Sequence, residues 1–285
     1  MESQKKYPTL LSFEFFPPRS AAGVATLADT VQQLLALKPN FFSVTFGAGG
    51  STQHETVDTV LHLQRTMSIE IAPHISCVAA SKDSILKMLQ LYQAQGIRHL
   101  VALRGDLPSG MVSRGEFSYA SDLVRFIREQ TGDYFHIDVA AYPEFHPQAL
   151  DAINDLQHFK EKIAAGANSA MTQYFYNVDA YIQFVKSCEL LDIDLPIVPG
   201  IMPITNHTQL ARFSDSCGAE IPRWIRKRLM SLGDDKAAIM EFGIDVVTSL
   251  CRDLLAAGAP GLHFYTLNNA KASVEIGKRL GLHTH

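Results

Sequence analysis

The sequence lacks the features that mark several large classes of protein. Its four cysteines are scattered over 285 residues and none lies in a C-x-x-C pair, so neither a disulfide framework nor a zinc ribbon is indicated. No apolar run approaches the roughly 18 residues that suggest a membrane-spanning helix. The formal net charge of −4 argues against a general nucleic-acid-binding surface. The first residues show no signal peptide, so we expect a cytosolic protein with reduced cysteines.

The sequence does contain an alternation of strand and helix patterns. Short β-branched and aromatic runs, separated by segments of helical period, occur at 12–16, 41–45, 69–76, 99–105, 136–142, 169–176, 196–202 and 261–267. Eight such units in a chain of this length are typical of a (β/α)8 TIM barrel. Extra helices are predicted before the last strand, at 206–216, 222–231 and 236–257. We assign residues 1–285 to one catalytic domain.

The alternative fold is an open doubly wound sheet. That fold would carry a G-x-G-x-x-G motif after the first strand, and the sequence there, SFEFFPPRS, has none. The segment GAGGS at 47–51 follows a strand but lacks the third glycine at the required spacing. The barrel is therefore favoured.

In a barrel, reactive groups belong at the carboxyl ends of the strands. Glu14 lies in the first strand among phenylalanines, and strand alternation places Ser12, Glu14 and Phe16 on one face. Burial in such surroundings can raise the pKa of a carboxyl group, which would make Glu14 a general acid near neutral pH. The alternative is a structural Glu14, paired with Arg19 or capping the next helix.

The other strand ends carry aromatic, amide and imidazole groups. Lysines are scarce there and the first strand has no H-x-H motif, which argues against a Schiff-base aldolase and a metal-dependent hydrolase. This composition favours a flat, partly polar ligand or cofactor. The residues concerned are Thr45, His74, Arg104, Asp106, Tyr142, His146, Gln173, His263 and Tyr265.

The motifs at these strand ends, in this order, resemble those of the methylenetetrahydrofolate reductase family of the bacterial single-barrel type. They are SFEFFPPR, FFSVTFGAGGS, APHISC, GIRHLVALRGD, DVAAYPEFHP, TQYFYN, VPGIMPITN and HFYTLN, and they span residues 12 to 268. The resemblance implies an FAD-dependent barrel that reduces methylenetetrahydrofolate to methyltetrahydrofolate with NADH or NADPH, for methionine synthesis. The two substrates are expected to use the same face of the flavin in turn. Relatives form dimers or tetramers, so a homo-oligomer is expected, without nucleic-acid or membrane partners.

The resemblance also implies roles for individual residues. It places the catalytic acid on Glu14 and a flavin-proximal aspartate, which also contacts folate, on Asp106. Further folate contacts fall on Gln173, Gln209, Phe213 and Asn269, the last of which stands where relatives often have arginine. Contacts to FAD or the nicotinamide nucleotide fall on Thr45, Phe46, Ala48, His74, Arg104, Gly105, Asp106, Tyr119, Ala120, Tyr142, His146, Asp155, His158 and Lys162. Glu161 stands where an arginine often precedes that lysine, which bears on pyrophosphate binding.

Two other functions are compatible with a barrel of this kind. One is a different flavin-dependent dehydrogenase, of the proline dehydrogenase-like type. The other is a barrel that binds folate or flavin as a sensor without turnover. The intact Glu14, Asp106 and Gln173 favour an enzyme over a sensor.

Overall fold

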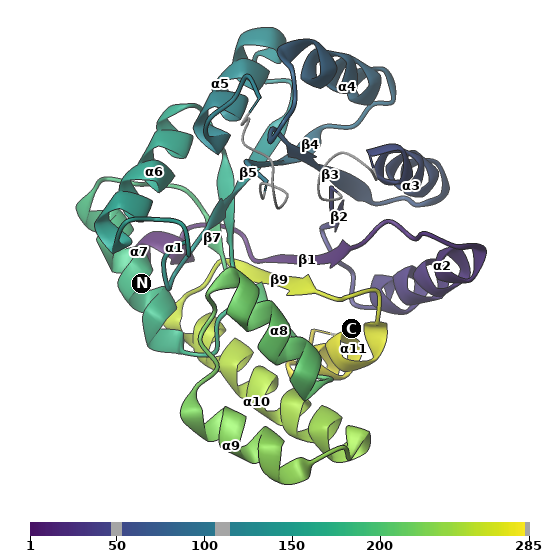
Figure 1. Cartoon of the computed structure of the whole chain (residues 1–285), viewed down its shortest axis with the longest axis vertical. Helices are drawn as coiled ribbons and strands as arrows, with labels where there is room; N and C mark the ends of the chain where they lie inside the picture. The colour runs from purple at the N-terminus through teal and green to yellow at the C-terminus, as the bar shows by residue number, and fades with distance from the viewer. Residues whose placement is uncertain (47–52, 106–114, 283–285) are drawn as a thin grey trace.

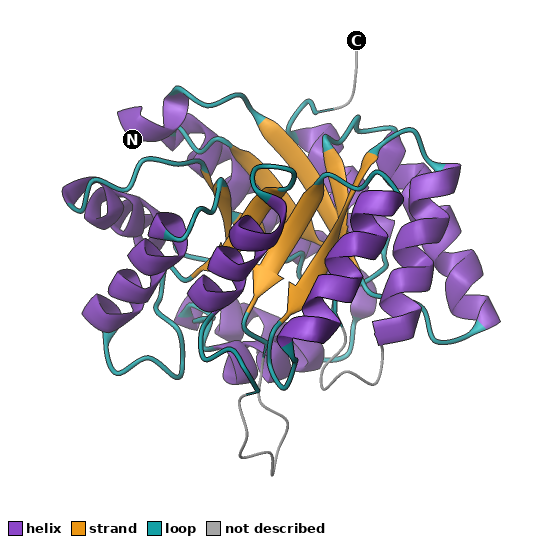
Figure 2. Ribbon diagram, turned by 90° about the horizontal axis from the view of Figure 1, so that it is seen from above, coloured by secondary structure: helices purple, strands orange, loops and turns teal. Residues whose placement is uncertain are grey.

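The computed structural model describes residues 1–46, 53–105 and 115–282, which form a ring of parallel strands surrounded by helices (Figure 1; Figure 2). The strands are β1 (Leu10–Phe15), β2 (Phe41–Val44), β3 (Glu70–Ser76), β4 (His99–Leu103), β5 (His136–Ala141), β6 (Ser169–Thr172), β7 (Ile197–Val198), β8 (Gly200–Ile201) and β9 (Gly261–Tyr265). Their order in the sheet is β7-β6-β5-β4-β3-β2-β1-β9-β8. The predicted TIM-barrel fold is confirmed.

The ring closes through a divided strand. The predicted strand 196–202 forms two short pieces, β7 paired with β6 and β8 paired with β9, on either side of Pro199. Proline has no backbone N–H for a ladder hydrogen bond, so it interrupts a strand. Its carbonyl oxygen nevertheless accepts a hydrogen bond of 3.0 Å from the backbone N–H of His263. The two pieces together occupy one strand position of the barrel.

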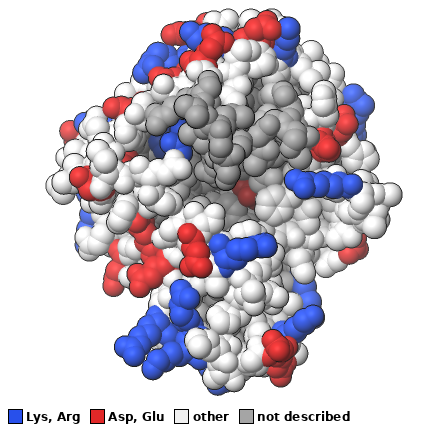
Figure 3. Space-filling view, in the orientation of Figure 1, with Lys and Arg blue, Asp and Glu red and all other residues white. Residues whose placement is uncertain are grey.

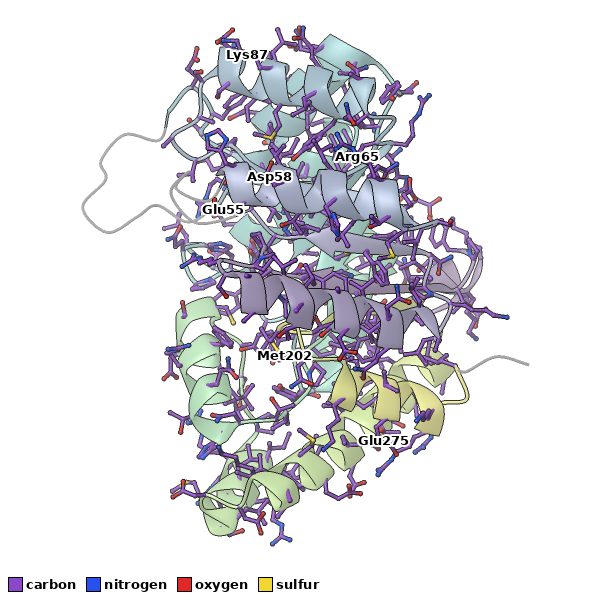
Figure 4. All side chains as sticks on the ribbon, turned by 90° about the vertical axis from the view of Figure 1, so that its right-hand side faces the viewer. Glu55, Asp58, Arg65, Lys87, Met202 and Glu275 are labelled. Carbon is purple, nitrogen blue, oxygen red and sulfur yellow. The ribbon has the colours of Figure 1, made fainter. Side chains whose placement is uncertain are left out.

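The helices lie outside the strands, and the three predicted before the last strand are present. The helices described are α1 (Glu2–Lys5), α2 (Ala21–Leu35), α3 (Gln53–Thr66), α4 (Lys82–Ala94), α5 (Ala120–Thr131), α6 (Ala152–Ala164), α7 (Val178–Leu190), α8 (His207–Cys217), α9 (Arg223–Leu232), α10 (Lys236–Ala257) and α11 (Ala270–Arg279). Figure 1 and Figure 4 show α4, α3, α2 and α11 side by side around the barrel, with Arg65 and Lys87 labelled on α3 and α4. None of the helices described is long and apolar enough to cross a membrane.

One prediction about element boundaries needs correction. The strand predicted at 169–176 ends at Thr172, because the backbone N–H of Tyr174 turns to the side-chain Oε1 of Gln173, at 3.0 Å, instead of continuing the ladder. Gln173 therefore lies just beyond the strand end. The short helix α1 was not predicted from the sequence patterns. Assignment of the whole chain to one domain stays a prediction.

Strand alternation divides the apolar residues into two layers. On β1 and β2 the side chains of Phe13, Phe15 and Phe42 are fully buried in the large cluster between the strands and the helices. A second, smaller cluster fills the inside of the barrel: Phe41, Ala72, Val101, Met171 and Val198. Close packing of both layers holds the strand ends, and the polar groups on them, in fixed positions.

The charged side chains and the cysteines are arranged as the composition suggested, with mixed charge on the surface and unpaired thiols. Figure 3 shows acidic and basic side chains scattered over one face, with lysines and arginines gathered at the α9 end. All four cysteines are free thiols, and Cys77, Cys188 and Cys251 are buried. Burial raises the pKa of the Cys188 thiol to about 12, which keeps it protonated and unreactive at neutral pH.

Candidate active site

A cavity of about 420 Å³ opens at the carboxyl end of the strands. Its wall draws on most of the strands of the barrel and on α8, as expected for a barrel enzyme. The lining residues are Glu14, Phe16, Thr45, Phe46, His74, Val101, Leu103, Val139, Ala140, Tyr142, Met171, Gln173, Tyr174, Met202, Phe213, Ser216, Cys217, Tyr265 and Leu267. The wall is mainly apolar, so the few polar groups decide what can bind and react.

Glu14 lies between two imidazoles at the base of this cavity. Its Oε2 is 3.3 Å from Nε2 of His74 and 3.6 Å from Nε2 of His263. The Glu14 side chain is 13% exposed, so the carboxylate touches the cavity while most of its surface is covered. We call Glu14, His74 and His263 the upper cluster.

The expectation that Glu14 is held protonated by burial is wrong for the ligand-free protein. Burial alone raises the pKa of this carboxyl, but the nearby imidazoles of His74 and His263 outweigh that effect and lower the pKa to about 2. The structural alternative is also wrong in its details, since Glu14 is paired with imidazoles rather than with Arg19. The next helix, α2, is capped by Ser20, whose Oγ accepts a 3.1 Å hydrogen bond from the backbone N–H of Gly23.

The upper cluster is held in place from below and from the side. Ser12 Oγ lies 2.8 Å from Nδ1 of His263, which fixes the ring so that Nε2 faces Glu14. The backbone carbonyl of Glu14 accepts a 2.6 Å hydrogen bond from Thr266 Oγ1. The side-chain amide of Asn268 makes two 2.9 Å hydrogen bonds with the backbone of Phe16. The end of β1 is therefore rigidly positioned.

A tyrosine closes the side of the cavity next to Glu14. Tyr265 donates a 2.7 Å hydrogen bond from its hydroxyl to the carbonyl of Thr172, and burial raises its pKa well above the usual range. Gly200 makes this approach possible, because a Cβ atom there would lie 2.1 Å from that carbonyl oxygen and 2.6 Å from the tyrosine ring. The phenol therefore acts as a neutral wall and hydrogen-bond donor.

A second cavity of about 410 Å³ adjoins the first and shares Leu103, Ala140 and Tyr142 with it. It contains nine of the residues predicted to contact FAD: Arg104, Gly105, Tyr119, Ala120, Tyr142, His146, Asp155, His158 and Lys162. The two cavities together form one continuous surface for an elongated ligand.

Lys162 is the buried cation of the second cavity. Its Nζ donates a 2.5 Å hydrogen bond to the carbonyl of Ala140, and no salt bridge to it is formed by the residues that the structure describes. Burial lowers the pKa of Lys162 to about 8, with Asp155 acting in the opposite direction. A buried ammonium with so little compensation favours an anionic ligand.

Further rings and carboxylates lie in the second cavity or next to it. The ring of Tyr119 stacks on that of His158, with centroids 4.8 Å apart and planes 22° apart. Glu161 lies 3.1 Å from Nδ1 of His158 through its Oε2, so its carboxylate is engaged with that ring. Asp155 accepts a 3.0 Å hydrogen bond from the backbone N–H of His146 and fixes the loop after β5.

The predicted folate contacts fall into two groups. Gln173 and Phe213 line the first cavity, where Gln173 follows β6 and Phe213 comes from α8. Gln209 and Asn269 lie together at a separate hollow of about 100 Å³ that shares Tyr265 and Leu267 with the first cavity. Asn269 caps α11, its Oδ1 accepting a 3.0 Å hydrogen bond from the backbone N–H of Lys271, so its side chain already has a structural task.

Some predicted site residues lie outside the second cavity and the two folate groups, and some lining residues were not predicted. Ala48 and Asp106 lie outside the described residues. Thr45, Phe46 and His74 line the first cavity rather than the second. His263 and Tyr265 were expected only as strand-end groups without a role of their own, and Met202, labelled in Figure 4, was not expected at the site. The signal for the first two was their spacing on the last strand, which alternates like Ser12 and Glu14 on its β1 neighbour.

The chain is similar to known proteins over almost its whole length. The methylenetetrahydrofolate reductase family model matches residues 1–281. The chain is 40% identical over 272 residues to 5,10-methylenetetrahydrofolate reductase of Escherichia coli (strain K12), covering 95% of this chain and 90% of that protein. It is 38% identical over 287 residues to methylenetetrahydrofolate reductase (NADH) 1 of Zea mays, covering 96% of this chain but 48% of that protein. The chain thus spans about half the length of the plant relative.

Solved structures share the fold at low sequence identity, and an example binds a folate. It is an uncharacterized protein from Clostridium thermocellum, described as binding two copies of 5-methyl-5,6,7,8-tetrahydrofolic acid. Its TM-score is 0.70 at 14% identity, with 98% of this chain and 96% of that chain covered.

Proposed function

The chain belongs to the methylenetetrahydrofolate reductase family, and we propose that it reduces methylenetetrahydrofolate to methyltetrahydrofolate with electrons from NADH or NADPH passed through FAD. The product would supply methyl groups for methionine synthesis. The observation that carries the proposal is the placement of Glu14, with two imidazoles, at the base of a cavity that continues into a second cavity holding a buried lysine.

FAD fits the second cavity by the chemistry of its donors. Lys162 offers a buried positive charge to the phosphates, and Arg104 lies on the wall of the same cavity. Tyr119 and His158 present a stacked pair of rings suited to contact with a planar group. The junction at Leu103, Ala140 and Tyr142 allows the flavin end of the cofactor to reach the first cavity. Bound there, FAD would accept a hydride from the nicotinamide nucleotide and later deliver it to the folate carbon.

The residues of the first cavity are suited to hold each substrate in turn against that end. Gln173 offers an amide to the polar edge of a pterin or a nicotinamide, since an amide both donates and accepts hydrogen bonds. Phe213 from α8 offers an apolar ring to the same ligands. Because both substrates need this one cavity, their binding is mutually exclusive and a ping-pong order follows.

The upper cluster is proposed to hold the proton that the reaction needs. Reduction requires a proton on the nitrogen that leaves the bridging carbon, so that the C–N bond breaks and the carbon becomes an electrophilic iminium. His74 and His263 lower the pKa of Glu14, and they are the only ionisable partners of this carboxyl among the described salt bridges, so we propose that the proton is shared within the upper cluster. Substrate that covers the cavity excludes water and moves that proton to Glu14, which delivers it.

The two half-reactions test the function separately. Protein reconstituted with FAD is mixed anaerobically with NADH or NADPH, and the loss of flavin absorbance is followed by stopped flow. The reduced protein is then mixed with methylenetetrahydrofolate, and reoxidation is followed. We expect bleaching by at least one nucleotide and reoxidation by the folate. Protein that does not retain FAD, or reduced protein that methylenetetrahydrofolate does not reoxidise, would contradict the proposal.

A further inference from the structure

A second group of ionisable side chains lies at the opposite end of the barrel from the upper cluster. His99 begins β4, His136 begins β5, and Asp138 lies two residues further along β5. The strand register pairs His99 with His136. We call His99, His136 and Asp138 the lower cluster; none of its members lines either large cavity.

The donor atoms of the lower cluster converge. His99 Nε2 lies 2.7 Å from Asp138 Oδ2, and His136 Nε2 lies 3.5 Å from Asp138 Oδ1. One nitrogen or oxygen from each of the three residues lies within 4.8 Å of the others. The side chains of His99 and Asp138 are 5% and 4% exposed, whereas that of His136 is 46% exposed. The cluster is thus buried on one side and open to solvent at His136.

A carboxylate also lies behind one of these imidazoles. Glu70 Oε2 is 3.5 Å from Nδ1 of His99, the nitrogen that faces away from Asp138. A carboxylate on the far nitrogen fixes the tautomer of a metal-ligating histidine and leaves Nε2 to bind the ion. Ser169 Oγ lies 2.7 Å from Nε2 of His136 and hydrogen-bonds Asp138, so a hydroxyl is also at hand.

We propose that the lower cluster is a binding site for a divalent metal ion of the zinc class. Two imidazoles and a carboxylate are a ligand set that Zn²⁺ accepts, and Ser169 or a water would complete a tetrahedral shell. The ion would take the place of the protons that now bridge His99 to Asp138 and His136 to Ser169. Because the ligands come from β4 and β5, the ion would tie these two strands together at the end of the barrel associated with stability.

Zinc uptake is the test. Protein stripped with EDTA and dialysed is titrated with Zn²⁺ by calorimetry, and bound metal is counted after gel filtration by mass spectrometry. We expect one tightly bound ion per chain, a raised melting temperature, and d–d absorption bands when Co²⁺ replaces Zn²⁺. None of these readouts depends on FAD, folate or reductase activity, so the result is independent of the proposed function.

Three variants locate the ion. His136→Gln removes the half-exposed ligand and should weaken Zn²⁺ binding by more than the roughly 10–100-fold expected of a change behind a ligand. Glu70→Gln changes a residue behind a ligand, so it should weaken Zn²⁺ binding by roughly 10–100-fold. His62→Gln, which changes an exposed histidine on α3, is the matched control and should bind as the parent does.

Two results would overturn the proposal. One is the absence of stoichiometric Zn²⁺ uptake by the parent protein, which would show that hydrogen bonds alone account for the lower cluster. The other is uptake that His136→Gln leaves unchanged, which would place the ion elsewhere. If His136→Gln fails to fold, Glu70→Gln still tests the site, because all three proposed ligands stay in place. Unchanged Zn²⁺ affinity in Glu70→Gln would then count against the site.

Discussion

The barrel contains the same arrangement twice, a buried carboxylate between two histidines, once at each end. In the upper cluster Glu14 lies 3.3 and 3.6 Å from His74 and His263 and touches a cavity. In the lower cluster Asp138 lies 2.7 Å from His99 and has Ser169 as a further hydrogen-bond partner. The same residue types are therefore loosely held and accessible at one end, and tightly bonded at the other.

The electrostatics of the two clusters differ in a corresponding way. In the lower cluster, burial alone would lower the pKa of His99, but Asp138 and Glu70 raise it to about 9. In the same pair, the imidazoles hold the pKa of Asp138 well below its usual range, against the effect of burial. In the absence of a metal ion, the lower cluster is thus a buried ion pair supported by short hydrogen bonds. In the upper cluster the Glu14 carboxylate lies farther from its imidazole partners, at 3.3 and 3.6 Å, and touches the first cavity.

The largest expected effect is the loss of stability when the lower cluster is broken. In metal-free protein, Asp138→Asn removes the closest counter-charge of the buried His99 imidazolium and leaves only the more exposed Glu70, so it should lower the free energy of unfolding by about 3–5 kcal/mol. Denaturant unfolding followed by circular dichroism measures this. The control is Asp83→Asn, which breaks the exposed Lys87–Asp83 pair and should change stability by at most about 1 kcal/mol. If both variants lose the same free energy of unfolding, the lower cluster contributes no more to stability than an exposed ion pair, and the account of it is wrong.

The next effect concerns the upper cluster and affects catalysis. Glu14→Gln should keep FAD and its reduction by the nicotinamide nucleotide, but slow reoxidation by methylenetetrahydrofolate by about 100-fold or more, because the amide cannot deliver a proton. Stopped-flow measurement of each half-reaction separates the two. If flavin reduction slows as much as reoxidation, Glu14 is a structural residue and its proposed role is wrong.

The predicted flavin-proximal aspartate can be tested in the same assay. Asp106→Asn should retain flavin but bind folate more weakly, since the resemblance gives this carboxylate contacts with both ligands. Folate affinity by equilibrium titration and the flavin reduction potential are the readouts. Values of both that match the parent protein would contradict the assignment.

A smaller effect should follow from removing the buried cation of the second cavity. Lys162→Met should weaken FAD binding by about 10- to 100-fold, the range of a charge-assisted hydrogen bond. The pKa of Lys162 is lowered to about 8, so the ammonium is charged below that pH and neutral above it. FAD affinity of the parent should therefore fall as pH rises through this range, while that of Lys162→Met stays flat. Parallel pH profiles would show that Lys162 does not meet the phosphates.

The smallest effect is expected from a change beneath the upper cluster. Ser12→Ala removes the hydroxyl that fixes His263 and should cost about 0.5–1.5 kcal/mol, seen as a roughly 2- to 10-fold slower folate half-reaction. Ser12→Thr keeps the hydroxyl and should recover most of the rate. A Ser12→Ala protein with the rate of the parent would show that the orientation of His263 is set elsewhere.

The sequence predicted the barrel and many of the polar and aromatic groups on the wall of the site, because strand alternation and strand-end position are local properties. The face shared by Ser12 and Glu14 follows from such patterns, whereas Gln173 was expected inside a strand at 169–176 and lies just beyond the end of β6. The ionisation of Glu14 does not follow from such patterns, because it depends on His74 from β3 and His263 from β9. The hydrophobic neighbours of Glu14 in sequence face the helices instead, so they suggested an apolar environment that the carboxylate does not meet.

The state of the Glu14 carboxyl is the most direct test of the account. Protein with ¹³C-labelled glutamate is studied by infrared difference spectroscopy, with Glu14→Gln used to assign the band, first without ligand and then with FAD and folate bound. The account predicts an ionised carboxylate at neutral pH in the ligand-free protein and a protonated carboxyl once folate covers the cavity. A carboxyl already protonated without ligand, or one that stays ionised with folate bound, would contradict it.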